Sequence, residues 1–194
     1  MENLYLMRHG ETEYSCRDVY YGSIDCPLNE KGLQDGASLR LIMQEIPLDI
    51  VIASPLIRAR DTAAILLEER DIPLIYDDRL KEIRFGAWEG VAWSDLAEDT
   101  LWQAWSKDWL HVRPPGGETF VEMTERARSF YEYLLKRPEA NIAIIAHNMV
   151  MVSLVTIMME IPTDAALHFH FSSGCYSHFF LRGTFPILEG HNLK

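Results

Sequence analysis

The stretch Leu4-Tyr5-Leu6-Met7-Arg8-His9-Gly10 joins an apolar run of strand length to a cation, an imidazole and a glycine. Strands buried in a parallel sheet read as continuous hydrophobic runs, and the ligands of open α/β sheets bind just beyond the carboxyl ends of such strands. The stretch therefore predicts a buried strand that places Arg8 and His9 where a small anion would bind. The alternative is that both residues are only the polar start of a loop.

Three further apolar runs predict strands that alternate with helices. The clearest is 141–146, which ends in His147-Asn148 and so repeats the layout of Arg8-His9. Shorter runs cover 49–53 and 73–76, and the tail predicts two strands, 175–181 and 186–188, at the edge of the sheet. Alternating strands and helices are typical of an α/β fold with a mostly parallel sheet. With no linker or repeat, residues 1–194 are expected to form a single domain.

Helices are expected from capping residues and from the spacing of apolar side chains. Asn29 is a good N-cap for a first helix. The expected apolar face of that helix carries Leu33, Ala37 and Leu41. Ser54 as N-cap, with Pro55 at the first helical position, predicts that a second helix starts there. Helical patterns also cover 120–134 and 150–159.

Composition limits the classes of function. The chain has 194 residues and a formal net charge of -11, which argues against a protein that works by gripping nucleic-acid phosphates. An anionic substrate must therefore be drawn by a local positive site. The odd set Cys16, Cys26 and Cys175 predicts free thiols. No apolar run is long enough to cross a membrane and no basic leader precedes the first strand, so we expect a cytoplasmic protein without a membrane partner.

Five candidate reactive residues follow predicted strands or lie in loops. They are Arg8, His9, Arg58, Glu82 and His147. The carboxyl ends of parallel strands converge on one crevice, so these residues can share a pocket. Arginine binds phosphate oxygens through a planar fork, a neutral histidine is a nucleophile near pH 7, and a carboxylic acid can protonate a leaving alcohol. The set predicts a site for phosphoryl transfer.

The signature Arg8-His9-Gly10-Glu11-Thr12 resembles that of the histidine phosphatase superfamily, the phosphoglycerate-mutase-like proteins. The match continues in order through Gly22, Asp25, Pro27-Leu28, Gly32, Ser54-Pro55-Leu56, Arg58-Ala59, Glu82, Phe85-Gly86, Trp88-Glu89-Gly90, Pro115-Gly116-Gly117-Glu118 and His147. This resemblance covers nearly the whole chain. It implies a three-layer α/β/α sandwich, with a mostly parallel central sheet and an antiparallel edge strand.

The resemblance also implies roles for the candidate residues. His9 would carry the phosphoryl group as a phosphohistidine, and Glu82 would donate and accept the proton. Arg8, Arg58 and His147 would form the phosphate pocket. Relatives of this kind use no metal and no organic cofactor.

Four further residues are candidates for substrate binding. Many relatives have Asn at the position of Ser15 and Gly at the position of Asn148, yet both side chains present here can still hydrogen-bond a phosphate oxygen. Tyr21 and Gly22, with Tyr20, would line the pocket mouth as the family's equivalent loop does, although a plain turn is an equally good interpretation.

Chain length and finer motifs bear on the substrate. The chain looks too short for a phosphoglycerate mutase, which carries additional segments. The stretches Trp105-Ser106-Lys107-Asp108-Trp109 and Gly174-Cys175-Tyr176-Ser177 resemble those of alpha-ribazole phosphatases of the cobalamin pathway. A broad-specificity sugar or nucleotide phosphatase, a mutase and a non-catalytic phosphate-binding protein remain as alternatives, and a homodimer remains open.

Three tryptophans and two histidines outside the signature each allow a functional and a structural interpretation. Trp102, Trp105 and Trp109 share a predicted helical face, which would form a wall for the substrate's flat benzimidazole base or simply pack into the core. His168 and His170 alternate on a possible strand, but no carboxylate or cysteine accompanies them at metal-ligand spacing, so no metal site is expected.

Overall fold

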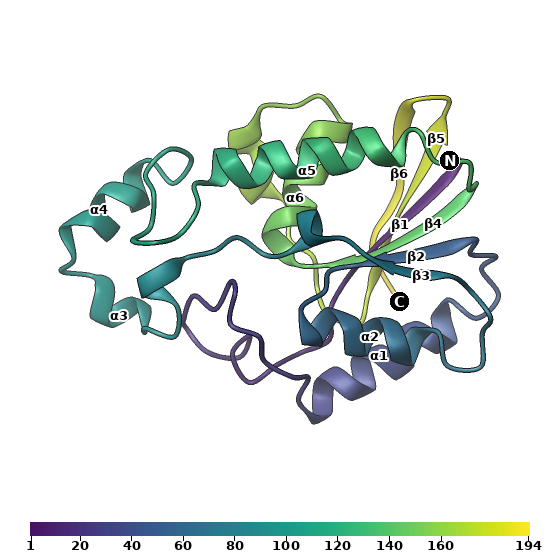
Figure 1. Cartoon of the computed structure of the whole chain (residues 1–194), viewed down its shortest axis with the longest axis horizontal. Helices are drawn as coiled ribbons and strands as arrows, with labels where there is room; N and C mark the ends of the chain where they lie inside the picture. Colours follow the sequence, from purple (N-terminus) through teal and green to yellow (C-terminus); the bar gives the residue numbers. More distant parts are fainter.

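A six-stranded sheet in the order β3-β2-β4-β1-β5-β6 forms the centre of the computed structural model, which describes residues 1–194 (Figure 1). The parallel strands are β1 (Asn3–Arg8), β4 (Asn141–Ala146), β2 (Ile50–Ala53) and β3 (Leu74–Tyr76). β5 (Tyr176–Arg182) pairs antiparallel with β1, and the edge strand β6 (Phe185–Leu193) pairs antiparallel with β5. The expected mostly parallel sheet is confirmed, and β5 is its one reversed strand.

Helices cover both faces of this sheet, which gives the expected three layers (Figure 1). α1 (Glu30–Ile42) and α2 (Ile57–Leu66) lie on one face, and α5 (Phe120–Leu134) and α6 (Asn148–Met158) lie on the other. Side chains alternate between the two faces along each strand. Leu4 and Leu6 of β1 therefore join the larger core cluster, while Tyr5 and Met7 join the smaller one.

The first helix forms where it was expected but buries a different face. The Asn29 side chain accepts from Gly32 N at 2.8 Å and caps α1. Leu33 and Leu41 are 51% and 66% exposed, so the predicted apolar face was wrong. The face that includes Gly36 is buried instead. Gly36 packs closely on α2, since a Cβ added there would lie only 3.1 Å from the Ile65 side chain.

The second helix begins at Ile57, three residues after the predicted N-cap. Its first amide is capped from a distant loop, since the carboxylate of Asp25 accepts from Ile57 N at 2.6 Å. Ser54 is therefore not the N-cap, and the prediction was wrong. The Ser54 hydroxyl lies 2.8 Å from the ring of His147 instead.

The remaining elements are short. They are the 3-10 turns η1 (Asp78–Leu80), η2 (Gly86–Trp88) and η3 (Thr163–His168) and the helices α3 (Trp93–Leu96) and α4 (Thr100–Lys107). Residues 92–112, here called the α3–α4 arm, extend away from the sandwich (Figure 1). His168 ends η3 and His170 lies outside any strand, so the expected alternation of these two residues on a strand was wrong.

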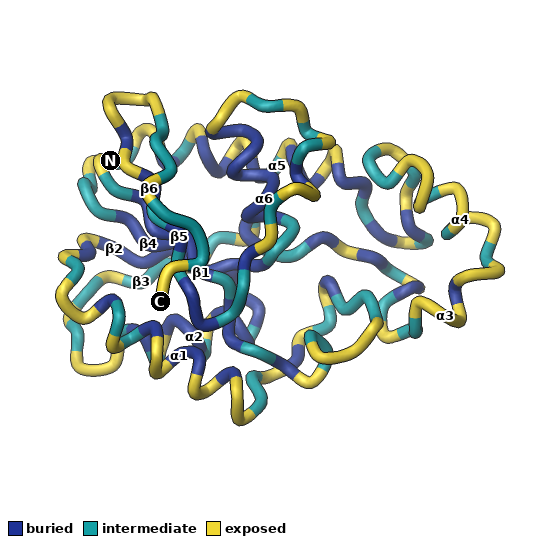
Figure 2. The backbone as a smooth tube through the Cα atoms, turned by 180° about the vertical axis from the view of Figure 1, so that it is seen from behind, coloured by how far each residue is buried: buried dark blue, intermediate teal, exposed yellow.

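The buried residues are concentrated in the central strands and in the helix faces that cover them (Figure 2). Residues 150–158 of α6 are buried on every side, as expected for a helix that is apolar all round. The α3–α4 arm is mostly exposed or half-buried. No helix is both long enough and apolar enough to cross a membrane.

Candidate active site

The two histidines of the candidate site are placed by strand register. Arg8 of β1 pairs with Ala146 of β4, so the next residue on each strand is His9 and His147. Their ring centres lie 5.0 Å apart, and each side chain is only 1% exposed. The paired ends of two neighbouring parallel strands thus bring together imidazoles that are far apart in sequence.

Arg58 links these imidazoles to the pocket-mouth loop. Its Nε lies 3.2 Å from His9 Nε2 and 3.3 Å from His147 Nδ1. Its two terminal nitrogens donate to the carbonyl oxygens of Ile24 at 2.7 Å and Gly22 at 2.8 Å. The Arg58 side chain is fully buried. Its guanidinium, which is always charged, contacts both imidazole rings.

The hydrogen bonds of His9 define which ring nitrogen is free. Nδ1 lies 2.7 Å from the carbonyl oxygen of Gly10, and therefore carries the proton that it donates. Nε2 is then the unprotonated nitrogen that accepts from Arg58. Burial, followed by the charges of Arg58 and Arg8, holds the pKa of His9 well below its usual range. His9 is a neutral imidazole whose unprotonated Nε2, held by the Arg58 N–H, carries the lone pair that a histidine nucleophile requires.

His147 is held by Ser54, the residue that the sequence predicted as the N-cap of the second helix. Nδ1 of His147 accepts from Arg58, so its Nε2–H donates to the Ser54 hydroxyl. Burial, followed by the Arg58 charge, holds the pKa of His147 well below its usual range. Ser54 is fully buried at the end of β2, which neighbours β4. That strand-end position is the signal that could have identified Ser54 as part of the site.

Glu82 lies between η1 and η2, with its carboxyl against the start of α6. Its two oxygens accept from Ile83 N at 3.0 Å and from Met149 N at 3.2 Å. Burial raises the pKa of Glu82, although the two amide donors and the nearby arginines act in the opposite direction. The carboxyl therefore keeps its proton to a higher pH than an exposed glutamate does.

Arg8 has one donor without a partner. One terminal nitrogen donates to the carbonyl oxygen of Phe171 at 3.1 Å, and the other lies 3.3 Å from the Tyr21 hydroxyl. Its Nε is buried and makes no hydrogen bond. A buried donor without an acceptor costs free energy, of which an anionic ligand would recover part.

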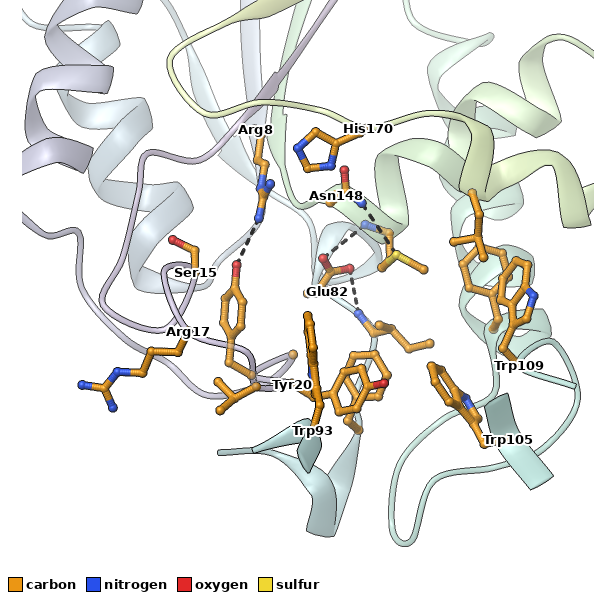
Figure 3. A pocket seen from close by; sticks show the side chains of 18 residues that line it. Arg8, Ser15, Arg17, Tyr20, Glu82, Trp93, Trp105, Trp109, Asn148 and His170 are labelled. Atoms are coloured by element: carbon orange, nitrogen blue, oxygen red, sulfur yellow. Dashed lines mark hydrogen bonds between the residues drawn. The ribbon is translucent and has the colours of Figure 1, made fainter. Parts of the chain in front are cut away.

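A cavity of about 410 Å³ opens beside these groups. Eleven of its 18 lining residues are hydrophobic. Arg8 and Ser15 lie at one end, Trp105 and Trp109 lie at the other, and Glu82 lies between them (Figure 3). His9, Arg58 and His147 are not in its lining. They are buried behind it, and Arg58 is 5.1 Å from the ring centre of Tyr21, which does line it.

All four predicted substrate-binding residues line this cavity. The Ser15 hydroxyl donates to Thr12 O at 2.9 Å, and the Asn148 side-chain oxygen accepts from Phe171 N at 2.8 Å. Gly22 passes so close to residue 83 that a Cβ would lie 2.0 Å from the carbonyl oxygen of Ile83. The Tyr20–Gly22 segment is therefore a close-packed part of the cavity wall.

The aromatic residues of the cavity differ from the predicted set. Trp105 and Trp109 line it, but Trp102 does not. Trp102 Nε1 instead donates to the Tyr20 hydroxyl at 3.3 Å, and Trp93 takes a place in the lining. The predicted shared face fails because α4 ends at Lys107, so Trp109 lies outside the helix.

His168, His170 and Cys16 lie outside the group formed by His9, Arg58 and His147. His170 lines the cavity and His168 does not. No group of three His, Cys, Asp or Glu side chains is positioned to hold a metal ion. Cys16 is a free thiol whose pKa is raised, chiefly by its hydrogen bond with Glu11, so nothing activates it as a nucleophile.

Comparison with known proteins identifies the class. Residues 4–194 match the model of the histidine phosphatase superfamily (branch 1). The chain belongs to this superfamily, and it is a phosphatase of that class.

Several similar proteins are described by a specific substrate as well as by the superfamily. An adenosylcobalamin/alpha-ribazole phosphatase of Salmonella typhimurium is 35% identical over 90% of this chain and 88% of its own length. A protein of the same description from Escherichia coli is 31% identical over 98% and 96%. The crystal structure of the alpha-ribazole phosphatase from Shigella flexneri superimposes with a TM-score of 0.94 at 30% identity, covering 98% of this chain and 96% of the other.

Proposed function

We propose that this phosphatase hydrolyses alpha-ribazole 5'-phosphate, a step of cobalamin synthesis, through a phosphohistidine on His9. The observation that carries the mechanism is the unprotonated Nε2 of a neutral, fully enclosed His9, 3.2 Å from Nε of Arg58. The substrate is supported by the descriptions of the relatives from Salmonella typhimurium and Shigella flexneri.

In the first step, His9 Nε2 attacks the phosphorus and the bond from phosphorus to the alcohol oxygen breaks. The guanidinium groups of Arg8 and Arg58 stabilise the charge that the phosphoryl oxygens carry in the transition state. The neutral His147 ring accepts from Arg58 Nε and holds that guanidinium in place. The Glu82 carboxyl gives its proton to the departing alcohol. Such proton transfer contributes roughly 10²–10⁴-fold.

In the second step, water attacks the phosphohistidine. The Glu82 carboxylate, which has just lost its proton, takes one from this water. The bond between phosphorus and Nε2 breaks, phosphate leaves, and His9 is again a neutral imidazole whose Nδ1–H donates to Gly10 O. The raised pKa of Glu82 suits it to both halves of this cycle.

The test has two parts. Mixing the protein with alpha-ribazole 5'-phosphate and stopping the reaction with denaturant should trap acid-labile phosphate on His9. His9→Ala should trap none and lose turnover, whereas His111→Ala, at an exposed histidine that does not line the cavity, should do both normally. A His9→Ala variant with normal turnover contradicts the mechanism.

The second part ranks phosphomonoesters by kcat/KM. We expect alpha-ribazole 5'-phosphate to exceed ribose 5-phosphate and 3-phosphoglycerate. Equal values across the panel would favour a broad-specificity phosphatase, and activity that requires a bisphosphorylated primer would favour a mutase.

A further inference from the structure

The cavity has two chemically different ends, and Glu82 marks the boundary between them (Figure 3). Arg8, whose buried Nε–H has no acceptor, and the Ser15 hydroxyl lie at one end. Trp105 and Trp109 lie at the other. A ligand that spans the cavity therefore meets a phosphate-binding surface and an aromatic surface on opposite sides of one carboxyl group.

The position of Glu82 gives a bound substrate its direction. This step rests on the proposed function, in which Glu82 protonates the oxygen that leaves. The phosphoryl group then lies on the side of Arg8, and the rest of the leaving alcohol extends past Glu82. That direction leads to the aromatic end.

The rings at this end are held in place before any ligand binds. Tyr20 stacks on Phe85 with ring centres 4.4 Å apart and lies 5.7 Å from Trp93. Trp109 packs edge-on against Phe120 at 4.6 Å. A surface whose side chains are already fixed loses little conformational entropy when a ligand binds.

Trp93 lies near Glu82, on the side of the cavity where the aromatic end begins (Figure 3), and is the ring that is left available. It lines the cavity and is 42% exposed, although it is one of the largest apolar side chains of the chain. Trp102 lies on the same arm and has a different role, because it donates to the Tyr20 hydroxyl from outside the cavity. The Tyr20 oxygen is thereby already engaged.

These contacts distinguish between two kinds of leaving group. A leaving group that places a sugar at the aromatic end would bring several hydroxyls to a surface made mainly of rings, and each hydroxyl that loses water without finding a partner costs free energy. A flat ring would instead stack on the exposed face of Trp93 and bury apolar area.

We propose that the aromatic end of the cavity is a subsite for a flat aromatic ring carried by the leaving alcohol, and that Trp93 of the α3–α4 arm selects that ring. The arm is thus the specificity element. It acts on the alcohol, while the strand ends act on the phosphoryl group.

The test compares two primary alkyl phosphates, 2-(1-naphthyl)ethyl phosphate, which carries an aromatic ring system, and n-butyl phosphate, which carries none. Both release a primary alcohol that needs a proton from Glu82, so the chemical step affects them similarly. Stacking of one ring system predicts that kcat/KM for the naphthyl compound is about 10- to 100-fold higher. Trp93→Leu should reduce this ratio about tenfold, mainly through KM. Leu101→Ala, an exposed residue of the same arm outside the cavity, should leave the ratio unchanged.

Three results are decisive. Equal kcat/KM for both compounds in the unaltered protein overturns the subsite and leaves the phosphatase mechanism intact. An unchanged ratio in a folded Trp93→Leu variant, checked by circular dichroism, overturns the role of Trp93. Failure of the folded protein to release phosphate from any phosphomonoester instead contradicts the proposed function.

Discussion

Arg126 of α5 donates to the main-chain oxygen of Glu82 across 3.2 Å. The same guanidinium donates to the main-chain oxygens of Arg79 at 2.7 Å and Lys81 at 2.6 Å, and it pairs with Glu118 at 2.7 Å. One side chain therefore holds three carbonyl groups of the segment that carries the proposed proton donor. This arrangement makes Arg126 a positioning residue for Glu82.

Replacing Arg126 with methionine should affect proton donation more than phosphate binding. We expect kcat for n-butyl phosphate to fall about tenfold or more, which is part of what a general acid contributes. The rate with p-nitrophenyl phosphate, whose leaving group needs no proton, should change much less. Arg113→Met is the matched control, because Arg113 makes an exposed ion pair with Glu122 near the start of the same helix. Equal losses with both substrates would contradict the positioning role.

Removing the Ser54 hydroxyl should release the ring of His147. Ser54→Ala deletes the 2.8 Å hydrogen bond that fixes the proton on Nε2, and a lost bond of about 1–1.5 kcal/mol predicts a fall in kcat of about tenfold. Nitrogen chemical shifts of His147 measured by NMR should show a mixture of tautomers. Ser38→Ala, at an exposed serine of α1, should alter neither. A single tautomer and a normal kcat in Ser54→Ala would count against this role.

The pH dependence of kcat/KM follows from two opposite pKa shifts. His9 must be unprotonated, and its pKa is lowered from 6.5, so activity is lost only as pH falls through a value below 6.5. Glu82 must be protonated, and its pKa is raised from 4.5, so activity with alkyl phosphates is lost as pH rises through a value above 4.5. Glu82→Gln should abolish the alkaline limb and lower the rate. If that limb persists in the variant, another group is the acid.

A methyl group at residue 22 should disrupt the wall of the cavity. The added Cβ of Gly22→Ala would lie 2.0 Å from the carbonyl oxygen of Ile83 and 2.8 Å from the Glu89 carboxylate, so the loop must move, at a cost of about 1–3 kcal/mol or more. We expect lower stability in denaturant unfolding together with a higher KM. Gly36→Ala is the comparison, since its Cβ would meet only the Ile65 side chain, at 3.1 Å rather than 2.0 Å, and alanine favours the helix. A Gly22→Ala variant with the stability and KM of the unaltered protein would show that the cavity wall tolerates the displacement.

Sequence reasoning reached the residues that strand geometry controls. Arg8, His9 and His147 directly follow apolar runs or end them, so the topology of a parallel sheet predicts that they meet. The positioning contacts were not predictable in this way. Arg126 reaches Glu82 from 44 residues away, and its choice of three carbonyl oxygens depends on how α5 packs on that segment.

The same limit applies to the arm and to the first helices. Helical spacing grouped Trp102 with Trp109, but the termination of α4 at Lys107 separates them and leaves the exposed ring at Trp93. For α1, the spacing of leucines was a weaker influence than the close approach of Gly36 to α2. Periodicity describes a helix in isolation, whereas the face that it buries is decided by its neighbour.

The pairing of β1 with β4 also links the site to the order in which the chain folds. Asn3 and Asn141 hydrogen-bond across 138 residues at the start of this pair, and contacts of such separation form slowly because a long loop must close first. A chain still emerging from the ribosome carries His9 well before it gains its partner His147, which lies 138 residues further along. Catalytic competence therefore reports on completion of the central sheet, and recovery of activity on refolding should follow β1–β4 pairing rather than the formation of any single helix.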